Sequence, residues 1–80
     1  MRKKAPLNVK NNLFLKKFGK RVREARLAKG WTLEEMEERG WASWQHLQQI
    51  ETGLKNINLT TLIKLTNLLD VDANKLLHDL

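Results

Sequence analysis

The chain has 80 residues, of which 41% are hydrophobic and 30% are charged, and it contains no cysteine. This length allows at most one domain, the composition is that of a soluble globular protein, and the lack of cysteine excludes disulfide frameworks and cysteine-ligated metal sites. The formal net charge of +6 is uneven, because residues 1–30 carry eleven basic residues against Glu24 alone, whereas residues 31–80 carry four against eight acidic ones.

The basic first third favours a polyanionic partner, although charge alone does not distinguish DNA, RNA, an anionic membrane surface or a merely solvated tail. Polar residues interrupt every apolar run near the N-terminus, so no export signal is predicted. No segment reaches the roughly 20 apolar residues that cross a bilayer. We therefore expect a soluble protein, and the cysteine-free composition fits the reducing cytoplasm.

Residues 1–10 hold the only proline, Pro6, and four basic residues, which predicts a basic, mobile N-terminal arm in front of a folded domain over residues 11–80. The first helix is expected from about Asn12 to Lys29, with Gly30 as its stop. Its core-facing stripe follows from apolar residues at helical spacing, namely Phe14, Phe18, Val22 and Ala25.

Arg26 falls on the same stripe as Val22, so its charge requires a partner if it is buried. Glu51, in a later helix, lies at the margin of that helix's buried face. An ion pair between Arg26 and Glu51 would satisfy both charges and fix one helix against the other. The alternative is that both side chains extend to solvent.

The second helix is expected to begin at Leu33, because Thr32 and Glu35 form the Thr-x-x-Glu pattern of a capping box. Gly40 ends it. Four glutamates within this helix are typical of a solvated surface rather than of acid–base catalysis.

Ser43 is the expected N-cap of a third helix that runs from Trp44 to about Thr52, with Gly53 as its stop. Helical spacing places Leu47, Ile50 and Leu54 on the inner face. The outer face then carries uncharged polar groups: Gln45, Gln48, Gln49 and Thr52. Because a glutamine amide both donates and accepts hydrogen bonds, as a base-pair edge requires, this pattern indicates either a DNA-reading helix or an ordinary polar surface.

Asn58 is expected to cap a fourth helix, and Asp72 a short fifth one. The fourth should be the most buried helix, with Leu59, Leu62, Ile63, Thr66 and Leu69 on its inner face, broadened by Leu65 and Leu68. The fifth carries Leu76, Leu77 and Leu80, which predicts either packing on the first helix or a dimer contact.

These residues together resemble the phage repressor and Cro type of helix-turn-helix domain, also called the xenobiotic response element family. The resemblance covers about residues 18–77. It rests on Gly-x-x-Val-x-x-x-Arg in the first helix, Glu-Glu-Met before the turn, Ile-Glu-x-Gly after the third helix and Leu-x-x-Leu in the fourth. It implies an all-α, five-helix lambda-repressor-like bundle that binds operator DNA, usually as a homodimer.

The resemblance also implies roles for individual residues. Base-reading positions fall on the start and outer face of the third helix: Ser43, Trp44, Gln45, Gln48 and Gln49. Phosphate-contacting positions fall on Thr32, Thr52, Lys55 and Asn56, and the internal bridge falls on Arg26 and Glu51. Trp44 is placed either beside the DNA or at the edge of the core, and Trp41 occupies a position where the turn usually has glycine.

The expected function is therefore a sequence-specific transcriptional regulator bound to double-stranded DNA. Two alternatives remain: an antitoxin or restriction-modification controller that acts with a protein partner, and a protein-interaction module with Trp41 and Trp44 as exposed anchors. An enzyme is not expected, because His46 and His78 are isolated and no phosphate loop or metal-ligand spacing occurs. No cofactor, catalytic residue or metal site is predicted, and His46 is expected at the rim of the reading helix or on the surface.

Overall fold

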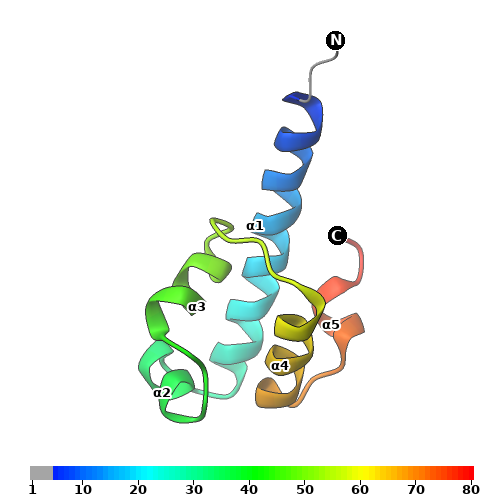
Figure 1. Ribbon diagram of the computed structural model, residues 1–80. Coiled ribbons are helices and arrows are strands. Elements are labelled where there is room, and N and C mark those ends of the chain that lie inside the picture. Colours follow the sequence, from blue (N-terminus) through cyan, green and yellow to red (C-terminus); the bar gives the residue numbers. More distant parts are fainter. Residues whose placement is uncertain (1–4) are drawn as a thin grey trace.

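The computed structural model describes residues 5–80, and their side chains from Leu13 onward. Over these residues the chain forms five helices and no strand: α1 (Ala5–Ala28), α2 (Leu33–Glu38), α3 (Trp44–Glu51), α4 (Leu59–Leu69) and α5 (Ala73–Leu77). Figure 1 shows α1 as the long central helix, with α2 and α3 on one side of it and α4 and α5 on the other. The predicted all-α, five-helix bundle is confirmed.

The first helix begins at Ala5, seven residues before the expected start near Asn12. Pro6 is then its second residue, a position where the missing N–H has no intrahelical partner to lose. The backbone is therefore helical over residues 5–10, where an arm was expected, and residues 1–4 of that arm lie outside the described part. The N-terminal end of α1 extends beyond the other helices (Figure 1).

Side-chain caps begin the four later helices at the predicted residues. Thr32 Oγ1 accepts from the Glu35 backbone N–H at 3.0 Å, and the Thr32 N–H donates to Glu35 Oε1 at 2.8 Å. Ser43, Asn58 and Asp72 each accept from the backbone N–H three residues later. Each cap satisfies a backbone donor that a helix start otherwise leaves unpaired, so all four predicted boundaries are confirmed.

The core is formed by buried side chains from all five helices and from the turn before α3: Phe18, Val22, Ala25, Met36, Trp41, Leu47, Ile50, Leu65, Leu69 and Leu76. Burial of Trp41 is a correction, because one alternative placed this residue outside as an anchor. Leu76 is buried, Leu77 is exposed, and the partly buried Leu80 packs against the core. None of the described helices is both long and apolar enough to cross a bilayer.

Three residues expected on core faces are exposed: Leu54, Leu59 and Ile63. Leu54 is 75% exposed, because it follows Gly53, whose φ of +82° turns the chain away from the axis of α3. In α4, Leu59 and Ile63 are exposed, whereas Leu69 is buried as expected, and so is Leu65, which was expected to broaden this face. This helix is therefore not the most buried one.

Gly19 sets the distance between α1 and α3. A Cβ atom built at Gly19 would lie 2.3 Å from the carbonyl oxygen of Ile50 and 2.5 Å from that of Glu51. No other residue fits without displacing the backbone of α3. The last turn of α3 therefore lies directly against the backbone of α1, and α1 forms the surface on which α3 packs.

Candidate nucleic-acid interface

The outer face of α3 is an uncharged polar surface. Gln45, Gln48, Gln49 and Thr52 are all exposed, while Leu47 and Ile50 are fully buried beneath them. Among the described residues, the three glutamine amides form no hydrogen bond with the protein. Their donors and acceptors therefore remain free for an external partner.

The N-terminal end of α3 is held by packing as well as by its cap. The His46 ring stacks on Trp41, with 5.9 Å between ring centroids and 21° between ring planes. Nδ1 of His46 and Nε1 of Trp41 are buried, and neither has a hydrogen-bond partner within the part of the chain that the structure describes. The His46 side chain is half-buried and packs against the turn, so it is not the exposed surface residue that was one of the two expectations. Trp44 is half-buried too.

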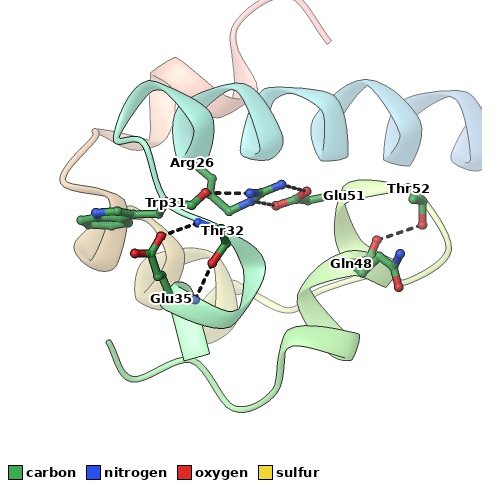
Figure 2. A network of polar contacts seen from close by, with 7 residues as sticks. All are labelled: Arg26, Trp31, Thr32, Glu35, Gln48, Glu51 and Thr52. Atoms are coloured by element: carbon green, nitrogen blue, oxygen red, sulfur yellow. Dashed lines mark hydrogen bonds and ion pairs between the residues drawn. The ribbon is translucent and has the colours of Figure 1, made fainter. Parts of the chain in front are cut away.

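Arg26 and Glu51 hold α3 against α1 through a two-pronged ion pair, which Figure 2 shows at its centre. Nε of Arg26 donates to Oε2 of Glu51 at 2.8 Å, and Nη2 donates to Oε1 at 2.9 Å. Both side chains are more than nine-tenths buried. The predicted contact is therefore present, and the alternative in which both charges extend to solvent is wrong.

A third hydrogen bond extends this network to the loop before α2. Nη1 of Arg26 donates to the carbonyl oxygen of Trp31 at 2.8 Å, and the capping box of α2 begins at the next residue. The hydrogen bond to Glu51 raises the pKa of Arg26 above its ordinary value, so this side chain stays charged throughout the pH range in which proteins fold. One guanidinium thus ties α1, the start of α2 and the end of α3 together.

The residues expected to contact phosphate are all exposed, and they come from the start of α2, the end of α3 and the loop after α3. Thr32 is exposed at the start of α2, and Thr52 is exposed at the end of α3, where its hydroxyl donates to the Gln48 carbonyl at 3.0 Å. Lys55 and Asn56 are exposed in the loop after α3. Asn56 also lines an apolar groove beside Phe14.

Two features of this region were missed in the sequence. Trp31 is half-buried, and the guanidinium carbon of Arg39 lies 4.0 Å from the centroid of its ring, a cation–π contact that closes the loop before α2. Arg23 lines a cleft beside Gln48 and Thr52. Helical spacing predicts neither contact, because each one joins residues of different structural elements and depends on how those elements pack.

The arrangement is suited to recognition. An amide-bearing helix lies on the surface, its inner face is fully packed, and an ion pair fixes its C-terminal end. Across the described residues, no three side chains of His, Cys, Asp or Glu come together as a metal site would require. A rigid helix with free amides can enter the major groove and contact base edges.

Comparison with known protein families supports a role for this chain in DNA recognition. A family model described as helix-turn-helix matches residues 22–76, which is more than half of the chain and includes all of α2, α3 and α4. No curated protein and no solved structure matches the chain.

Proposed function

The chain belongs to the helix-turn-helix family, and from this premise we propose that it is a sequence-specific transcriptional regulator that binds operator DNA through α3. Family membership makes it a DNA-binding regulator in general terms, and it confirms the resemblance to the phage repressor and Cro type. The proposal adds that α3 enters the major groove. Gln45, Gln48 and Gln49 then contact base edges, with Ser43 and Trp44 at the start of the helix.

The observation that carries the proposal is the free amide face. A glutamine side chain pairs in bidentate fashion with adenine N6 and N7, which favours adenine-containing positions in the operator. The exposed Thr32, Thr52, Lys55 and Asn56 flank this face and supply phosphate contacts, which fix register without reading sequence.

We further propose that the protein binds DNA as a homodimer. An apolar groove of about 250 Å³ lies between the first half of α1, the loop before α4 and the end of α5, and Phe14, Leu59 and Leu77 are exposed along it. A two-fold interface requires one surface that is complementary to itself, and this surface has both a hollow and protruding side chains. Partners of other kinds, as an antitoxin or restriction-modification controller would have, could also cover it.

Selection of bound oligonucleotides from a random pool, followed by titration against selected and random DNA over a range of salt, tests the regulator proposal. We expect an enriched sequence and an affinity that falls steeply with salt, because phosphate neutralisation releases counterions. A protein-interaction module on the same fold would show neither. Copurification of a second protein would support the alternative of a partnered regulator.

A further inference from the structure

A cleft of about 250 Å³ opens beside the amide face, where α1, α2 and α3 meet. Its walls are both polar and apolar, and they are formed by Arg23, Arg26, Leu33, Gln48, Glu51 and Thr52. Gln48 and Thr52 belong at once to this cleft and to the outer face of α3. Whatever lies in the cleft is therefore adjacent to a partner that contacts α3.

The charges of the cleft leave one positive charge without a counter-ion. Arg26 and Glu51 neutralise each other through their ion pair. Arg23 is exposed, and among the described residues it forms no salt bridge or side-chain hydrogen bond. The cleft residues thus carry a net charge of about +1, which Arg23 supplies.

The hydrogen-bond donors of the cleft also single out Arg23 as the residue available to bind a ligand. Arg26 uses Nε, Nη1 and Nη2 for Glu51 and Trp31, and the Thr52 hydroxyl donates to the Gln48 carbonyl. Arg26 commits three of its five N–H donors and is buried, so the exposed side chains of the cleft with uncommitted donors are Arg23 and Gln48. A planar guanidinium matches two oxygens of a phosphate group, which makes it a strong and directional partner for a phosphodiester.

We propose that this cleft binds one phosphate group of the DNA backbone and that Arg23 is the residue that contacts it. The inference rests on the proposed function, which it extends by a backbone contact on α1. A phosphate held here, next to Gln48, fixes the distance between the DNA backbone and the amides of α3. Arg23 thereby sets the register of α3 on the duplex without reading a base.

Glu34 opposes this contact. It lies in the first turn of α2, close enough to Arg26 to contribute to the raised pKa of that guanidinium. An anion in the cleft experiences the Glu34 carboxylate as a like charge. Glu34→Gln should therefore raise the affinity for all DNA sequences, the reverse of a change at Arg23.

The test compares wild type, Arg23→Gln and a matched control, Arg21→Gln, on selected and random DNA. Arg21 is on the same helix, but it lies toward α5, where its Nη1 donates to the Lys75 carbonyl at 3.4 Å. Arg23→Gln should weaken binding to both DNAs equally and lower the salt slope by about one. Between 50 and 200 mM salt, wild type should then lose about three- to fourfold more affinity than the variant. Arg23→Lys keeps the charge and should keep most of the slope.

A scan with single neutral methylphosphonates locates the contact. One substituted phosphate should weaken wild type and Arg21→Gln but leave Arg23→Gln unaffected. Equal effects of Arg23→Gln and Arg21→Gln, or no phosphate that distinguishes them, would overturn the cleft assignment while the regulator proposal stands. If wild type shows no salt-dependent binding to any DNA, the proposed function itself is wrong. Unchanged thermal melting of Arg23→Gln confirms that the comparison concerns folded protein.

Discussion

Arg26 and Glu51 lie 25 residues apart in the sequence and join α1 to α3 through two charged hydrogen bonds of 2.8 and 2.9 Å. Figure 2 shows the same guanidinium bonded to the carbonyl of Trp31, directly before α2. The helix that carries the amide face is therefore tied to its support at the end opposite the Ser43 cap. This connection makes the orientation of α3 sensitive to a single buried charge.

Glu51→Leu should destabilise the protein by about 3–5 kcal/mol, because it leaves the Arg26 charge buried without a partner. Urea unfolding followed by circular dichroism measures the change. The double variant Arg26→Met/Glu51→Leu removes both charges, and it should recover most of the lost stability. Exposed Glu38→Leu serves as the control and should shift the free energy of unfolding by less than about 0.5 kcal/mol. A Glu51→Leu variant as stable as this control would contradict the structural role of the pair.

Gly19→Ala should destabilise the protein, although alanine is the better helix former by about 1 kcal/mol. The added Cβ would meet the carbonyl oxygens of Ile50 and Glu51, and moving α3 away is expected to cost about 1–3 kcal/mol net, as overpacking does. The exposed neighbouring variant Lys20→Ala is the control. Stabilisation by Gly19→Ala in thermal melting would show that the two helices do not lie this close.

Leu65→Ala and Ile63→Ala, two residues apart in α4, should differ strongly. Leu65 is fully buried, so its truncation should cost about 2–5 kcal/mol. Ile63 is 52% exposed, and its truncation should change stability by less than about 0.5 kcal/mol. Chemical denaturation of both variants measures the difference. Equal losses of stability would indicate that Ile63 is buried, as the sequence pattern predicted.

Gln49→Ala should lower discrimination at one base pair by about 1–3 kcal/mol, because it removes a direct base contact. Lys55→Ala should instead weaken binding to all sequences alike and reduce the salt slope by about one. Competition titrations with operators mutated one base pair at a time separate the two effects. Equal losses on selected and random DNA for both variants would contradict the assignment of Gln49 to base reading.

Leu59→Ser should weaken homodimer formation, because Leu59 is 70% exposed on the edge of the apolar groove. Leu54→Ser is the matched control, since Leu54 is 75% exposed and does not line that groove. Sedimentation velocity over a range of concentrations measures the dimer. If wild type remains a monomer at the concentrations that saturate operator DNA, the homodimer proposal fails.

The helix starts could be predicted because capping is local. Thr32 and Ser43 each act on a backbone N–H three residues away, so a few sequence letters contain the whole interaction. The Arg26 to Glu51 contact was also accessible, because helical spacing places each charge at the margin of an apolar face.

The inner face of α4 was predicted only in part, because six of its eleven residues are apolar and helical spacing allows more than one stripe. Leu54 was misplaced because the pattern of α3 was continued beyond Gly53, whose positive φ ends it. Trp41 lies in a turn, where periodicity gives no information. Its burial depends on contacts made after the helices pack, including His46 stacked on its ring.

Arg23 was missed for a related reason. Helix α1 carries many basic residues, and a cation on such a helix is usually solvated. Which of them lies beside α3 depends on where the two helices cross, and that crossing is set at Gly19. The amide face itself was visible in the sequence, because it required only the spacing within one helix.

The positions of the three tryptophans have a practical consequence. Trp31 lies under Arg39, Trp41 is in the core beneath the turn, and Trp44 begins α3, so all three surround the helix-turn-helix unit. The chain has no tyrosine. Its ultraviolet emission therefore originates almost entirely around that unit, and an optical titration with unlabelled oligonucleotide can report directly on this part of the molecule.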